Sequence, residues 1–216
     1  AGAKRLIHIS SLGAHPNANS HYARTKAEGE RAVSAEFPNA IILRPSLVFG
    51  PEDEFFNRFA AMARLSPFLP LIGGGRTRFQ PVYVGDLAAA IANIADGAGE
   101  AGRIYEIGGP EELSFRELLD RIQDYAGRHR FYLPLPFWLA KLQALMTAPL
   151  PNSLRPITVD QVRSLKEDNV VSAAARAQHR TLADLGVTKP TAIASIVPGY
   201  LERFKPRGQY SSYRNG

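Results

Sequence analysis

The first 45 residues alternate between short apolar runs and a helix-forming segment, and this order strongly limits the fold. The apolar run at 5–10 predicts a strand, and Ser20 is a suitable N-cap for a helix over 21–37. A second apolar run at 40–43 predicts another strand after that helix. Two strands joined by a helix form a βαβ unit, which implies a parallel sheet covered by helices. The sequence therefore predicts an α/β fold.

Alternating elements continue to about residue 127, after which apolar segments broken by proline predict a smaller, mostly helical lobe. We expect a strand over 79–84, followed by an alanine-rich helix that Asp86 caps and that reaches Asp96. Ser114 is expected to cap an amphipathic helix. The other expected elements are a helix carrying Phe55, Phe56, Phe59 and Met62, a turn at 73–75, a strand over 103–107, and weak helices near 136–147, 158–167 and 191–204.

The composition excludes several classes of function. Cysteine is absent, which excludes disulfides, thiolate metal ligands and a cysteine nucleophile. The five histidines lack the HxxxH and HExxH spacings of zinc sites, so no metal site is expected. No run reaches the roughly 18 apolar residues that a spanning helix needs. The net charge is +6, but the basic residues are dispersed and form no recognised nucleic-acid motif, so no nucleic-acid partner is expected.

Tyr22 and Lys26 give the most informative chemical pattern. Residues four apart on a helix share a face, so the phenol and the ammonium can point into one cleft. A lysine cation favours the phenolate form of a nearby tyrosine, which can then exchange a proton with a substrate oxygen. Ser11 ends the first strand, where a parallel sheet presents side chains to its ligand crevice. A surface tyrosine beside a solvated lysine is the ordinary alternative for the pair alone.

The order of the motifs is more specific than any one of them. The chain resembles the extended short-chain dehydrogenase/reductases in three motifs that occur in the same order. These are Ser10-Ser11 at a strand end, Tyr22-xxx-Lys26 on a helix, and Arg44-Pro45 to Gly50-Pro51 after the next strand. That resemblance implies a Rossmann-type, doubly wound parallel sheet that binds NAD(P). It makes Ser11, Tyr22 and Lys26 the catalytic residues, with Lys26 also binding the ribose. It implies cofactor contacts from Ser10, Tyr22, Lys26, Pro45, Ser46, Leu47 and Val48.

Several segments are similar to one atypical branch, the NAD(P)-binding accessory subunits of respiratory complex I. They lie at 9–14, 22–30, 37–45, 49–57 and 80–84. This likeness implies a tightly held NADP(H), favoured over NAD(H), that is mainly structural. It implies other complex I subunits as partners and a peripheral place on the matrix or cytoplasmic face of the respiratory inner membrane; outside this branch, a cytoplasmic location is expected.

The likeness is incomplete at the N-terminal end. No strand-borne glycine-rich turn for the pyrophosphate occurs, and the residues that choose between NAD and NADP are missing with it. The chain also begins almost directly on a strand, so we expect it to be the C-terminal part of a longer protein. We expect an incomplete NAD(P)-binding unit with inserted lobe elements over 1–127, a C-terminal lobe over 128–204 and a basic tail over 205–216.

Three hypotheses remain open for the function. The first is the accessory subunit, and the second is an active NAD(P)-dependent nucleotide-sugar epimerase, dehydratase or reductase with Tyr22 as the proton donor. The third is a docking module that keeps a vestigial site. The apolar segment 131–147 forms either the core of the lobe or a face that docks on a protein or a membrane surface, since Trp and Tyr suit such boundaries. Whether the protein turns over a substrate is left open.

Overall fold

The computed structural model describes residues 2–146 and 158–206. Most of the basic tail expected at 205–216 lies outside the described residues. Strands β1 (Ile7–Ile9), β2 (Ile41–Pro45) and β7 (Ile104–Ile107) form a parallel sheet in the order β1-β2-β7. The central register aligns His8, Ile42 and Ile104 across the three strands. A parallel sheet joined through helices confirms the predicted α/β class.

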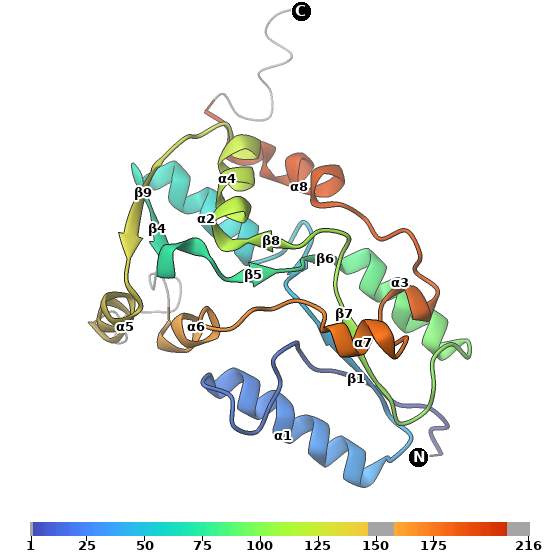
Figure 1. Cartoon of the computed structure of the whole chain (residues 1–216). Coiled ribbons are helices and arrows are strands. Elements are labelled where there is room, and N and C mark those ends of the chain that lie inside the picture. Colours follow the sequence, from blue (N-terminus) through green and yellow to red (C-terminus); the bar gives the residue numbers. More distant parts are fainter. Residues whose placement is uncertain (1, 147–157, 207–216) are drawn as a thin grey trace, which may run out of the picture.

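Two helices cover opposite faces of this sheet (Figure 1). Ile41 and Leu43 point to one face, where they are buried in a cluster with Leu87 of α3 (Val84–Ala95). Arg44 points to the other face, where its guanidinium binds the carboxylate of Glu30 on α1 (His21–Glu36). Neighbouring residues of a strand alternate between faces, which accounts for this division. The sheet therefore positions α1, the helix that carries the Tyr-xxx-Lys motif.

A second buried cluster forms the lobe. It is apolar and draws on segments from both halves of the chain. Its elements are helices α2 (Phe55–Leu65), α4 (Phe115–Ala126), α5 (Phe137–Met146), α6 (Val159–Ser164) and α8 (Ile193–Leu201), with the paired strands β4 (Phe68–Ile72) and β9 (Phe131–Leu135). Figure 1 shows the lobe on the side of the molecule where α2, α4 and α8 lie, with α6 beside the start of α1. The domain boundaries expected at 127 and 204 stay predictions.

Short strand pairs and turns connect the two clusters. β3 (Val48–Phe49) pairs in parallel with β6 (Val82–Tyr83), and β5 (Arg78–Phe79) pairs antiparallel with β8 (Leu113–Ser114). Helix α7 (Ala173–Ala177) follows α6 along the chain. Single 3₁₀ turns lie at Gly73–Gly75, Ala183–Leu185 and Glu202–Phe204, the first of them where the sequence predicts a turn.

The predicted strand over 79–84 and the predicted cap at Asp86 are both wrong. The strand is divided into β5 and β6, because Pro81 lacks the N–H that a continuous ladder requires. Helix α3 begins at Val84, so Asp86 lies within its first turn. Its carboxylate instead accepts hydrogen bonds from the backbone N–H of Thr191, at 2.6 Å, and from the Thr191 hydroxyl, at 3.0 Å. Asp86 therefore fastens a distant segment to the start of α3.

The predicted caps at Ser20 and Ser114 are confirmed. The Ser20 hydroxyl accepts a hydrogen bond from the N–H of Ala23 at the start of α1. The Ser114 hydroxyl accepts from the N–H of Glu117, whose carboxylate accepts from the Ser114 N–H in return. This reciprocal capping box satisfies two backbone donors at the start of α4.

The apolar segment 131–147 is divided between the lobe core and the surface. Leu135 and Ala140 are buried in the lobe cluster, whereas Phe131 and Trp138 are 75% and 69% exposed. The segment therefore contributes to the lobe core, while docking by its exposed face stays a prediction. Among the described residues, the helices are too short or too polar to cross a bilayer.

Candidate functional site

Two buried serines lie directly after β1. The Ser10 N–H donates to the carbonyl of Leu43 at 2.7 Å, and the Leu12 N–H donates to the carbonyl of Pro45 at 2.9 Å, so this segment continues beside β2. Ser10 and Ser11 are 2% and 8% exposed, and within the described part of the chain their hydroxyls have no hydrogen-bond partner. A buried hydroxyl without a partner is costly. Both serines line a cavity, so a ligand there could supply that partner.

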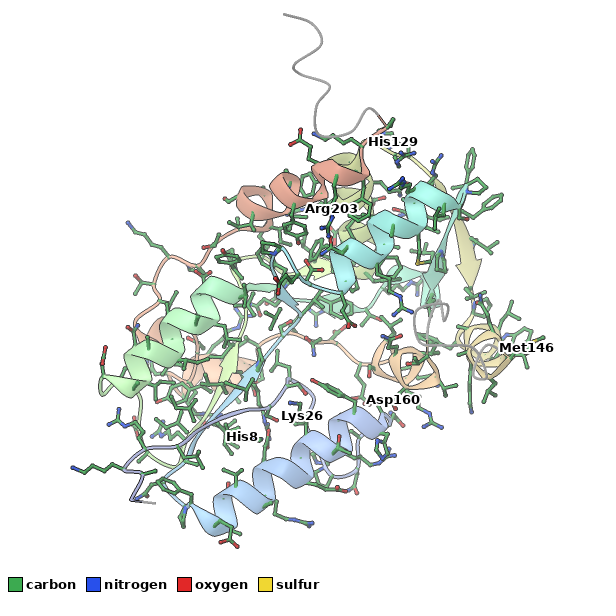
Figure 2. All side chains as sticks on the ribbon, turned by 180° about the vertical axis from the view of Figure 1, so that it is seen from behind. His8, Lys26, His129, Met146, Asp160 and Arg203 are labelled. Atoms are coloured by element: carbon green, nitrogen blue, oxygen red, sulfur yellow. The ribbon has the colours of Figure 1, made fainter. Side chains whose placement is uncertain are left out.

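Helix α1 brings Tyr22 and Lys26 to the same side. The Lys26 Nζ lies 5.8 Å from the centre of the Tyr22 ring and donates to the carbonyl of Ile9, at the end of β1, at 3.1 Å. Tyr22 is 51% exposed. The ammonium is therefore held between the helix and the strand end, as Figure 2 shows for the side chain of Lys26. The spacing of four residues gives the shared face that the sequence predicts.

The segment after β2 supplies a third wall, but its one hydroxyl is already used. The Ser46 Oγ lies 2.7 Å from the side-chain oxygen of Asn169 and 2.8 Å from its carbonyl oxygen, and it accepts from the N–H of Gln80 at 3.2 Å. The single hydroxyl proton of Ser46 is thus donated within the protein. We infer that Ser46 shapes the backbone from Pro45 to Val48 and offers no hydroxyl to a ligand.

All of the predicted site residues border one cavity of about 460 Å³. It is lined by Ser10, Ser11, Tyr22, Lys26, Pro45, Ser46, Leu47 and Val48. They come from three separate segments, which meet because the carboxyl ends of parallel strands share one edge of the sheet. The structure brings the candidates together, while the catalytic and cofactor-binding roles of the individual side chains stay predictions.

Asp160 and Asn169 belong to the site but are missed by the sequence analysis. The two carboxylate oxygens of Asp160 accept the backbone N–H groups of His21 and Tyr22, at 2.6 and 2.9 Å. Figure 2 shows Asp160 close to the start of α1. The Asn169 side chain lines the cavity and reaches Ser46. The capping box of Thr158 predicts the start of α6, but no local pattern shows that α6 meets a helix 138 residues earlier.

Most of the other charged groups near the site form internal pairs. Arg44 makes a bidentate contact with the buried Glu30 at 2.6 and 2.8 Å, which raises the pKa of Arg44 and identifies it as a structural partner. The Arg78 backbone N–H and then its guanidinium bind Asp168 and lower the pKa of that carboxyl. His15 and His21 are exposed. Among the described residues, no group of three or more His, Asp or Glu side chains is placed to hold a metal.

Among known proteins, the chain is similar in sequence to proteins named as mitochondrial subunits of the NADH:ubiquinone oxidoreductase. The "NADH dehydrogenase [ubiquinone] 1 alpha subcomplex subunit 9, mitochondrial" of Arabidopsis thaliana is 39% identical over 79% of this chain and 44% of its own length. The "NADH-ubiquinone oxidoreductase 40 kDa subunit, mitochondrial" of Neurospora crassa is 27% identical over 95% of this chain and 52% of its own length. The chain thus spans about half the length of these curated relatives.

Solved structures show the same fold at lower identity. An NADPH-dependent quinone oxidoreductase of Escherichia coli, complexed with NADPH, superposes with a TM-score of 0.70 at 21% identity. The superposed region covers 93% of this chain and 66% of the oxidoreductase chain. A dTDP-glucose 4,6-dehydratase of Streptomyces venezuelae, with NAD bound, superposes with a TM-score of 0.64 at 21% identity. That superposition covers 99% of this chain and 62% of the dehydratase chain. These likenesses confirm the predicted Rossmann-type fold. A model of the RmlD substrate binding domain matches residues 12–189, and the chain therefore belongs to that family.

Proposed function

We propose that this chain forms the nicotinamide side of an NAD(P)H site in an accessory subunit of respiratory complex I, where the cofactor mainly stabilises the fold. Three relatives at 37–39% identity that cover two thirds or more of this chain carry the name of one complex I subunit. The observation that carries the proposal is the cavity, in which a lysine and two buried, unpartnered serine hydroxyls lie together.

The residues around the cavity fit the reduced end of a dinucleotide. Lys26 has donors for ribose hydroxyls, and Ser10 and Ser11 have unused hydroxyls at the carboxyl end of β1. The backbone from Pro45 to Val48 faces the same space and can bind the carboxamide of the nicotinamide. A bound, reduced nicotinamide would supply a hydride. Tyr22 is the group in this cavity suited to hold or move a proton at a substrate oxygen.

A ligand that binds the folded state alone stabilises it, by about 2.7 kcal/mol when its concentration is a hundred times the Kd. A tightly held cofactor therefore contributes a large share of the stability of a chain this size. The proposal needs no turnover, which distinguishes it from an active epimerase, dehydratase or reductase.

We further propose that the cofactor is NADP(H) in preference to NAD(H). The subunit would lie peripherally on the matrix or cytoplasmic face of the respiratory inner membrane. The exposed face of β9 and α5 is the surface proposed to meet the membrane.

Two substitutions in the full-length protein test the proposal. Lys26→Met removes the ribose-binding ammonium, and we expect the purified protein to lose its nucleotide. The exposed Lys189 lies outside the cavity, so Lys189→Met is the matched control and should retain it. Tyr22→Phe should keep both the nucleotide and co-purification with respiratory subunits. Turnover of a nucleotide sugar that Tyr22→Phe abolishes would contradict the proposal and support the active enzyme.

A further inference from the structure

A second cavity, of about 590 Å³, adjoins the first. Tyr22, Leu47 and Val48 line both cavities, so the phenol stands at the boundary between them. This volume is within the range of pockets that enclose small organic ligands, roughly 300–1,000 Å³. The second cavity therefore lies where a molecule could meet both Tyr22 and the proposed nicotinamide position.

One wall of the second cavity is aromatic. Phe55 lies at its centre, with ring-centre distances of 5.0 Å to Phe59 and 6.1 Å to both Phe79 and Phe115. These four rings belong to three segments, α2, β5 and α4, and all four line the cavity. Leu165 extends the same apolar surface. Burial of apolar ligand surface against such a wall is favourable. The aromatic rings provide neither a cation nor a hydrogen-bond donor for a phosphate group.

The charges around the second cavity are unsuited to a nucleotide sugar. A pyrophosphate needs cations and backbone donors, and arginine is the side chain that binds it best. The charged residues lining this cavity are one cation, Arg58, and two carboxylates, Glu54 and Asp160. The carboxylate of Asp160 also occupies the N–H groups of His21 and Tyr22 at the start of α1, which would otherwise attract an anion.

From the aromatic wall and this charge balance, we propose that the second cavity binds a neutral, largely apolar molecule with a carbonyl or hydroxyl group. The oxygen of that group lies at Tyr22, and its apolar body lies against Phe55 and its neighbouring rings. This inference rests on the NAD(P)H site proposed above for the placement of the oxygen. The aromatic wall and the charge balance support the class of ligand independently of that site.

Binding of a neutral fluorescent probe, N-phenyl-1-naphthylamine, to the full-length protein tests the inference. We expect a saturable rise in fluorescence, which the neutral ketone 2-acetylnaphthalene reverses and UDP-glucose does not. Reversal by UDP-glucose at the same concentration as the ketone, or no saturable rise, would overturn the inference.

Two exposed glutamates provide a matched pair of variants. Glu54 lines the second cavity and Glu52 does not, although both precede α2. Glu54→Trp should place an indole in the space of the second cavity and weaken probe binding by about tenfold or more, whereas Glu52→Trp should leave probe binding unchanged. Equal probe binding by the two variants would contradict the assignment of the cavity.

The nucleotide content of each variant, measured after denaturation, separates this inference from the proposed function. Both variants should retain the nucleotide, because neither glutamate lines the first cavity. Probe binding without any nucleotide in the parent protein would contradict the proposed function and leave the apolar ligand class supported. Retained nucleotide with displacement of the probe by UDP-glucose would contradict the ligand class alone.

Discussion

Replacing Asp160 tests whether the lobe holds the helix that carries Tyr22. Asp160→Ala removes both hydrogen bonds that its carboxylate accepts at the start of α1, from His21 at 2.6 Å and from Tyr22 at 2.9 Å. It also removes a negative charge from the positive end of the helix dipole. Hydrogen bonds to a charged group contribute about 1.5–3 kcal/mol, and a charge at a helix terminus about 0.3–1 kcal/mol.

These contributions are reduced here, because the contact is open to water and the freed N–H groups can bind water instead. We therefore expect Asp160→Ala to lower the free energy of unfolding by about 1–3 kcal/mol, and Asp160→Asn, which keeps one acceptor, by about half as much. For a chain of this size the alanine variant should lower the Tm by about 2–12 °C. Urea and thermal unfolding of the full-length protein, with NADPH in excess, provide the measurement.

Glu167 provides the control for Asp160. Its carboxylate accepts a hydrogen bond from the side chain of Asn19 at 2.7 Å, so it joins the same two parts of the molecule without binding the start of α1. Glu167→Gln should change the free energy of unfolding by less than about 0.5 kcal/mol. If Asp160→Ala changes stability no more than Glu167→Gln does, Asp160 does not hold the helix, and the reasoning fails.

Three further predictions follow from the same geometry. Ser11→Ala removes a buried hydroxyl that has no partner among the described residues, so without nucleotide it should not lower the unfolding free energy. It should nevertheless weaken nucleotide binding, as calorimetry would show. Glu30→Gln should cost about 1–3 kcal/mol in urea unfolding, since it leaves the half-buried Arg44 without its anion. The pKa of Asp168 is lowered by Arg78, so the stability from that contact is present above the ordinary carboxyl range and is lost as the pH falls below about 4. Asp168→Asn should therefore reduce the fall in Tm between neutral and acidic pH, and an unchanged profile would contradict the assignment.

Local sequence signals predicted the features that depend on nearby residues. The caps at Ser20 and Ser114 are confirmed because a capping side chain binds an N–H only three residues ahead. The shared face of Tyr22 and Lys26 follows from helical geometry in the same way. The meeting of the predicted site residues around one cavity was instead expected from the βαβ pattern and the family resemblance, and these local signals alone do not give it.

Features that depend on distant residues could not be read from the sequence. The role of Asp160 requires knowing that α6 meets α1, which are far apart along the chain. The pairing of β4 with β9 is hidden because each strand contains a proline, at Pro70 and Pro134, a residue that argues against a strand in a single sequence. In an isolated pair, each strand has an outer edge on which a proline costs no ladder hydrogen bond.

The nucleotide carried by the purified full-length protein tests the central claim most directly. The protein is denatured, and the released small molecules are separated and quantified together with their redox state. The account predicts a stoichiometric amount of NADP(H), released from the parent and the Tyr22→Phe variant alike and missing from Lys26→Met. A protein that releases no dinucleotide, or a Lys26→Met variant that retains it in full, would contradict the account.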